Sequence, residues 1–156
     1  MFYIIGAVLL IFIDQLTKFL VVENISLHSE IPLIKNVISL SYIQNTGAAW
    51  GIFSNGTLFL TIFTIVILIL GGFYIYKNKI KDIWFNISMM LIFAGAIGNL
   101  IDRFFRNGAV VDMIKTDFIE FPVFNFADCC VVIGAICLSV FILFRYDDKE
   151  TLNGQH

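Results

Sequence analysis

Two long apolar runs without any charged side chain constrain the fold of this chain more than any other feature of its sequence. They extend over residues 57–76 and 83–101, and a helix of either length crosses about 30 Å of lipid hydrocarbon. Two further apolar segments, at 2–22 and 125–144, each contain a few polar residues. We therefore expect four transmembrane helices.

The overall composition agrees with a membrane protein and excludes several functional classes. Hydrophobic residues make up 59% of the 156 positions and charged residues 14%, whereas soluble domains carry about 25% charge. The formal net charge of −2 provides no basic face for nucleic acid, and no glycine-rich loop indicates a nucleotide. At this length we expect one integral membrane domain over residues 1–156.

Basic residues near the segment ends predict the orientation of the chain. The two sides carry equal numbers of Lys and Arg, but Lys77, Lys79 and Lys81 are clustered in the short connection between the second and third segments. Clustered basic residues beside helix ends favour the cytoplasmic side. We therefore expect both termini in the cytoplasm and the longer connections, 23–56 and 103–123, outside.

The first outer connection contains a pattern that is typical of a β-strand. Ile38, Leu40 and Tyr42 alternate with Ser39 and Ser41, which suits a strand with one face on an apolar surface. The expected fold is therefore an all-α membrane protein with a small extracytoplasmic sheet on the outer membrane surface.

The polar residues within or beside the four segments gather toward one side of the membrane. An ionisable side chain at membrane depth costs about 2.5 to 3.5 kcal/mol, so such residues indicate a function by default. With the first helix running outward, the outward helix ends and the outer connections can bring them to one depth. We therefore expect one buried site near the outer interface. Its candidate residues are Asp14, Lys18, Asn45, Asn99, Asp102, Arg103, Asp112, Asn125 and Asp128.

Several of these residues also have a purely structural interpretation. Asp14 and Lys18 are one helical turn apart and can neutralise each other, and structure is the better interpretation of Asp102. Asn125 can cap a helix, and Asp128 can favour a helix start, where its charge meets the positive end of the dipole. Spacing alone favours a site but leaves these alternatives open.

Neither a metal site nor a histidine-based catalytic pair is indicated by the sequence. Cys129, Cys130 and Cys137 lack the spacing of metal ligands, and His28 and His156 lie far apart in a loop and a tail. We therefore expect no metal and no cofactor.

Five short strings follow one another from the first segment to the fourth. They are DQLTK at 14–18, NTGAAWG at 45–51, GNLIDR at 98–103, VVD at 110–112 and FNFAD at 124–128. In this order, and with this placement relative to four spans, they resemble the bacterial lipoprotein signal peptidases, also called signal peptidase II. Two positions depart from the usual family pattern: Met113 stands where Phe is more frequent, and Cys129 stands where Ser is more frequent.

The resemblance implies a membrane aspartic endopeptidase with a four-helix bundle and an outer β-cradle. Such an enzyme removes the signal peptide from diacylglyceryl-modified prolipoproteins and cleaves just before the lipid-modified cysteine. We expect it in the bacterial plasma membrane as a monomer surrounded by phospholipid. By motif match, Asp112 and Asp128 are the catalytic pair. The supporting or substrate-binding positions are Asp14, Lys18, Asn45, Gly47, Asn99, Asp102, Arg103, Asn125 and Ala127.

Two carboxylates in one site suggest how such a reaction proceeds. They do not both ionise easily, so the pair is expected to retain one proton. The ionised member can then take a proton from an attacking water while the protonated member polarises the scissile carbonyl. Two other classes stay open on the residues alone: a small ion or proton transporter, which normally places its carboxylates near the bilayer midplane, and a non-enzymatic membrane scaffold.

Overall fold

Four helices and one small sheet make up the part of the chain that the computed structural model describes, residues 2–47 and 56–145. Each helix is long and apolar enough to cross a membrane, and the sheet is antiparallel, so the expected fold class is confirmed. All four helices continue beyond the end of the expected segment. The helices are α1 (Phe2–Asn24), α2 (Thr57–Asn78), α3 (Ile83–Phe105) and α4 (Phe126–Arg145), and the strands are β1 (Glu30–Ile34), β2 (Ile38–Asn45) and β3 (Val110–Thr116).

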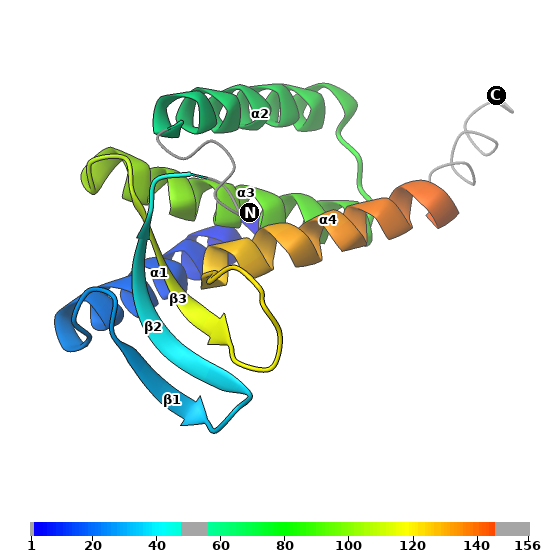
Figure 1. Ribbon diagram of the computed structural model, residues 1–156. Coiled ribbons are helices and arrows are strands. Elements are labelled where there is room, and N and C mark those ends of the chain that lie inside the picture. Colours follow the sequence, from blue (N-terminus) through cyan, green and yellow to red (C-terminus); the bar gives the residue numbers. More distant parts are fainter. Residues whose placement is uncertain (1, 48–55, 146–156) are drawn as a thin grey trace, which may run out of the picture.

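Helices α1, α3 and α4 pack side by side, and α2 lies on the far side of α3 (Figure 1). Glycines allow the backbones of α3 and α4 to approach closely, as is usual between membrane helices. A Cβ atom added at Gly95 would lie 2.3 Å from the carbonyl oxygen of Ala127, and one added at Gly134 would lie 2.9 Å from that of Ser88. The bundle is therefore interlocked by backbone contacts as well as by side chains.

The sheet has the strand order β1-β2-β3 and lies beside the C-terminal half of α1 (Figure 1). An apolar cluster joins it to that helix. Fully burying one such aliphatic side chain is worth about 1.5 to 3 kcal/mol, so the cluster fixes the sheet against the bundle. Its buried members are Val21 from the last turns of α1, Ile25 just after that helix, Tyr42 from β2, and Val111 and Met113 from β3.

The alternation in β2 predicted the strand but not the full extent of its burial. Leu40 and Tyr42 pack against the apolar cluster, but Ser39 and Ser41 are buried as well. The register between β2 and β3 shifts between Leu40 and Ile43, so strict alternation ends there and two consecutive residues, Ser41 and Tyr42, are buried. The strand is thus covered on both faces rather than one.

Candidate active site

The start of α4 is held by a reciprocal pair of hydrogen bonds between Asn125 and Asp128. The backbone N–H of Asp128 donates to Oδ1 of Asn125 (3.0 Å), and the backbone N–H of Asn125 donates to Oδ2 of Asp128 (3.0 Å). This is a capping box, in which the residue before the helix and the third residue inside it satisfy each other's backbone. The structural interpretation of both residues is therefore correct, and it also fixes one carboxylate at the helix start.

Three asparagine amides surround Asp112 and Asp128 with hydrogen-bond donors. Nδ2 of Asn45 donates to Oδ2 of Asp112 (2.9 Å), and Nδ2 of Asn125 donates to Oδ1 of the same residue (2.7 Å). Nδ2 of Asn99 donates to Oδ1 of Asp128 (2.7 Å). The amide of Asn125 thus links the two carboxylates, since its oxygen caps the helix at Asp128 while its nitrogen holds Asp112.

Neighbouring groups that can only donate determine which way two of these amides face. Lys18 Nζ donates to Oδ1 of Asn99 (2.9 Å), and the backbone N–H of Gly47 donates to Oδ1 of Asn45 (2.9 Å). Because an ammonium and a backbone N–H cannot accept a hydrogen bond, each amide oxygen must face them. The NH₂ group of each amide is therefore directed toward a carboxylate.

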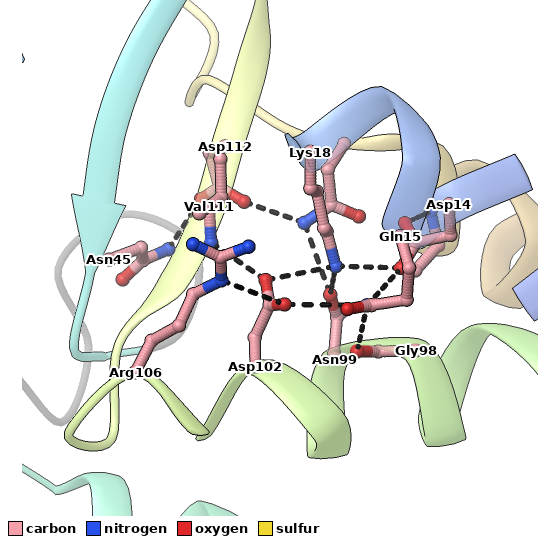
Figure 2. Close-up of polar contacts among 12 residues, drawn as sticks. Asp14, Gln15, Lys18, Asn45, Gly98, Asn99, Asp102, Arg106, Val111 and Asp112 are labelled. Atoms are coloured by element: carbon pink, nitrogen blue, oxygen red, sulfur yellow. Dashed lines mark hydrogen bonds and ion pairs between the residues drawn. The ribbon is translucent and has the colours of Figure 1, made fainter. Parts of the chain in front are cut away.

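Lys18 is fully buried between two carboxylates (Figure 2). Its Nζ lies 2.9 Å from Oδ2 of Asp14, one turn away on α1, and 3.2 Å from Oδ2 of Asp102 on α3. The charge pair proposed for Asp14 and Lys18 is therefore present, but it is shared with a third residue. Asp14 Oδ1 also accepts from the backbone N–H of Ala127, and Asp102 Oδ2 accepts from that of Val111, both at 3.0 Å. The charged group thus ties α1, α3, α4 and β3 together.

Gln15 also belongs to this network, although it was not among the expected site residues. Its Nε2 donates to Oδ2 of Asp14 (3.0 Å), to the carbonyl oxygen of Gly98 (3.0 Å) and to Oδ1 of Asp102 (3.3 Å), as Figure 2 shows. Adjacent residues on a helix do not normally face the same partner, so its position beside Asp14 gave no signal. Its place inside the DQLTK string was the one available indication.

A cavity of about 720 Å³ opens onto both aspartates between α2, α3, α4 and the segment that precedes α4. Its walls are mostly apolar, as expected for a site that accepts a ligand with a large apolar part. Five expected site residues, Asp14, Lys18, Asp102, Asn125 and Ala127, are buried in the protein interior, where they hold the lining. The expected residues that line the cavity are Asn45, Gly47, Asn99, Arg103, Asp112 and Asp128.

Part of the expected site lies outside the residues that the structure describes. The rest of the NTGAAWG string, residues 48–51, lies outside the described residues. Within residues 2–47 and 56–145, no group of three or more His, Cys, Asp or Glu side chains is arranged to hold a metal ion.

Burial in β3 raises the pKa of Asp112 to about 6. Removal of its carboxylate from water is the main cause, and the nearby charge of Asp128 adds to it, while the hydrogen bonds from Asn45 and Asn125 oppose it. Asp112 therefore retains a proton to a higher pH than an ordinary aspartate. A carboxyl group with such a pKa can donate and accept a proton near neutral pH.

Comparisons with known proteins identify the family of this chain. The family model for signal peptidase (SPase) II matches residues 6–144. A lipoprotein signal peptidase of Enterococcus faecalis is 38% identical over 154 residues, which cover 99% of this chain and 94% of that protein. Another, of Streptococcus thermophilus, is 43% identical over 147 residues and covers 94% of this chain and 92% of its own.

The solved structures that resemble this chain are membrane enzymes. One, described as a bacterial membrane enzyme, has a TM-score of 0.85 at 34% sequence identity and covers 99% of this chain and 92% of its own. A second with the same description has a TM-score of 0.83 and also 34% identity, covering 92% and 93%. Their agreement in fold extends over nearly all of both chains. This multi-pass membrane protein is therefore a peptidase and belongs to the signal peptidase II family.

Proposed function

We propose that this peptidase removes the signal peptide from diacylglyceryl-modified prolipoproteins and cleaves just before the lipid-modified cysteine. The observation that carries the proposal is the pair Asp112 and Asp128, which share one bridging amide and line one mostly apolar cavity. The names of the relatives support the substrate class. The match to a peptidase family favours this function over the transporter and scaffold alternatives.

The charges of the buried network support a catalytic pair that carries one proton. Two carboxylates, Asp14 and Asp102, are matched by two cations, Lys18 and Arg106, whose Nε lies 3.4 Å from Asp102 Oδ1. This group therefore contributes no net charge to the site. Uncompensated charge at membrane depth is costly, so the remaining groups should balance as well.

Arg103 is the cation that lines the cavity with the two aspartates. A pair with one proton carries a single negative charge, and that charge matches the guanidinium. Loss of that proton would give the pair a second negative charge, which the guanidinium does not balance, in a poorly hydrated part of the protein. We therefore assign one shared proton to the pair without dividing it between Asp112 and Asp128, because coupled groups titrate together.

The reaction then needs only this pair and one water. The ionised carboxylate takes a proton from the water as its oxygen bonds to the scissile carbonyl carbon, and the protonated carboxyl donates a hydrogen bond to the carbonyl oxygen. When the tetrahedral intermediate collapses, the C–N bond breaks and the leaving nitrogen receives a proton from the pair. The asparagine donors hold both carboxylates in position throughout, so little reorganisation is required.

The substrate's lipid part fits the apolar walls of the cavity. Phe63 and Ile67 of α2 and Val131 and Val132 of α4 line it, and acyl chains can lie against them in contact with the bilayer. Arg103 supplies a cation for the polar part of the substrate near the cleavage point. We further propose that the chain acts as a single-domain monomer surrounded by phospholipid.

The two ends of the bundle support an orientation. Lys77 lies in the last turn of α2, and Lys79 and Lys81 lie in the connection to α3, at the opposite end of the bundle from the sheet and the start of α4 (Figure 1). We place that basic end in the cytoplasm of a bacterial plasma membrane, with both termini. The aspartates then lie near the extracytoplasmic face, where a prolipoprotein emerges.

The test is cleavage of a diacylglyceryl-modified prolipoprotein by the purified protein in lipid, measured by gel shift. Asp112→Asn and Asp128→Asn keep the size of each side chain and remove its acid. We expect wild type to cleave and both folded variants to lose nearly all activity, a fall of roughly 10³-fold or more, as for loss of an essential acid or base. Full activity in either variant would overturn the catalytic assignment, and an inert wild type would overturn the substrate class.

A further inference from the structure

We propose that Thr57, the first residue of α2, is a positioning residue that fixes the cavity wall on α2 to the strand ends beside the catalytic pair. This inference rests on the proposed function. Oγ1 of Thr57 lies 2.6 Å from the carbonyl oxygen of Gly108 and 2.9 Å from that of Thr46. A hydroxyl has one proton, so it donates to these two carbonyls in a shared or alternating bond. We call this arrangement the Thr57 clasp.

The two carbonyls in the clasp belong to the two strands that carry the site. Thr46 follows the last residue of β2, and Gly108 lies just before the start of β3. The last pair of that ladder is Asn45 with Val110, so the clasp holds the chain on both sides of it. Strand ends fray when nothing secures them, and here a side chain from another helix does so.

The fit around Gly108 shows that the clasp is tightly packed. This glycine has a φ of 87°, and a Cβ atom added to it would lie 2.4 Å from Cγ2 of Thr57. The methyl group of Thr57 thus rests on the glycine while its hydroxyl reaches the carbonyl of the same residue. The backbone N–H of Gly108 also donates to the carbonyl oxygen of Arg103 (3.0 Å). The clasp therefore connects α2 to the end of α3 that carries the cavity's cation.

Helix α2 depends on such a link because its own packing is slight. None of its 22 residues, all of which are described, is buried. The hydroxyls of Thr61 and Thr64 and the amide of Asn78 donate to carbonyls within the same helix, so they do not join it to its neighbours. Nevertheless Phe63, Thr64 and Ile67 form one wall of the cavity. The ring contact of Tyr74 with Phe85 of α3 lies toward the other end of the helix, so the clasp helps to fix the position of this wall relative to the aspartates.

Loss of the Thr57 hydroxyl should be felt first at Asn45, the residue next to Thr46. The amide of Asn45 is oriented by the turn that includes Gly47 N–H, and it donates to Asp112. The hydrogen bond from Asn45 favours the ionised form of Asp112 and so lowers its pKa. A loosened turn weakens this hydrogen bond, so Asp112 should hold its proton to higher pH. The expected signature is therefore a lower kcat/KM together with an alkaline shift of the pH profile.

The experiment compares variants of α2 in the cleavage assay in lipid. Thr57→Val keeps the shape of the side chain and removes the hydroxyl, whereas Thr57→Ser keeps the hydroxyl. We expect kcat/KM to fall roughly tenfold in Thr57→Val, the loss typical of one hydrogen bond in a positioned site, and to stay within about twofold of wild type in Thr57→Ser. Thr61→Val, which removes a hydroxyl bonded inside the same helix, should match wild type in rate and pH profile.

Each outcome bears on one proposal. Wild-type kcat/KM and pH profile in Thr57→Val would overturn the role of Thr57, as would equal losses in Thr57→Ser and Thr57→Val. If Thr57→Val does not fold, Thr57→Ala is compared with Thr57→Ser, because these differ by the hydroxyl alone, and equal activities would again overturn the inference. Full activity in Asp112→Asn would overturn the proposed catalytic pair instead, whatever the Thr57 variants do.

Discussion

Helices α2 and α3 contact each other but are opposite in character. Helix α2 is the most apolar of the four spans and has no buried residue, whereas α3 is the least apolar and has the largest buried share. In a soluble protein the most apolar helix would occupy the core. In a membrane, an apolar helix is as stable against lipid hydrocarbon tails as against a protein core. Small and polar residues therefore drive the packing of helices instead. The polar residues of α3 therefore reflect its central place in the bundle.

The division of roles in the site follows this contrast. Helix α3 contributes Asn99 and Asp102 to the hydrogen-bonded network that holds the aspartates, and it carries the glycines that admit α4. Helix α2 contributes a wall of the cavity. The proposed catalytic pair is thus held by the interlocked bundle and by the sheet packed against it, while part of the cavity is bounded by a helix with little packing of its own. Changes on the two helices should differ accordingly.

The largest effect is expected from Lys18→Met. This change removes the cation between Asp14 and Asp102 and leaves two buried carboxylates without their ammonium partner. Breaking a buried ion pair in this way costs about 3 to 5 kcal/mol, so we expect a lower thermal unfolding temperature in lipid and loss of cleavage. Lys115→Met, which removes an exposed partner of Glu30, is the control and should unfold like wild type. An unchanged unfolding temperature in Lys18→Met would contradict the network's structural role.

A smaller effect is expected from adding one methyl group to α3, and almost none from the same change on α2. Gly95→Ala would place a Cβ atom 2.3 Å from the carbonyl oxygen of Ala127, so α4 must move, at a cost of about 1 to 3 kcal/mol. At Gly72 the nearest atom is a ring carbon of Phe93 at 4.0 Å. Gly72→Ala should be neutral or slightly stabilising, because alanine favours helix by about 0.5 to 1 kcal/mol.

Thermal unfolding of both alanine variants in the same lipid gives the measurement. The contrast between the helices predicts a marked drop in the unfolding temperature for Gly95→Ala alone, with a matching loss of cleavage because Ala127 adjoins Asp128. Equal unfolding temperatures for the two variants would show that α2 and α3 are packed equally tightly, which would contradict the difference between the two helices.

The smallest effect is expected from Asn45→Ala, which alters the proton balance more than the fold. The hydrogen bond from Asn45 lowers the pKa of Asp112, so its loss should move that pKa upward from about 6. The folded protein then keeps the shared proton of the pair to higher pH, and the alkaline decline of kcat/KM should shift to higher pH by the same amount. Gln44→Ala, which alters the exposed neighbour of Asn45, serves as the control. A decline at unchanged or lower pH would refute the assigned donor.

The sequence was sufficient to predict the four spans and most of the polar residues that the fold brings together, and the reasons differ. Long uncharged runs require helices in lipid, and the alternation around Leu40 predicted a strand. The site residues could be found because charge at membrane depth is rare. Gln15 escaped notice because glutamine has no preferred depth and its partners Gly98 and Asp102 lie more than eighty residues away.

Two further features could not be predicted because each depends on how the chain packs. A transmembrane segment can have the same apolar composition whether it faces lipid or protein. Nothing in residues 57–76 therefore indicated that α2 would have no buried residue. The structural and functional interpretations of Asn125 were weighed as alternatives, but its oxygen caps α4 while its nitrogen holds Asp112. One amide can do both because its two ends bind different partners.

The hydrogen bond from the backbone of Ala127 to Asp14 has a consequence for how the protein assembles during its synthesis. It joins α1 to α4, which is synthesised later, immediately beside Asp128. While the chain is being made, the proposed catalytic pair therefore stays incomplete until α4 has entered the membrane and docked against α1. Competence for cleavage then arrives with the packing of α4.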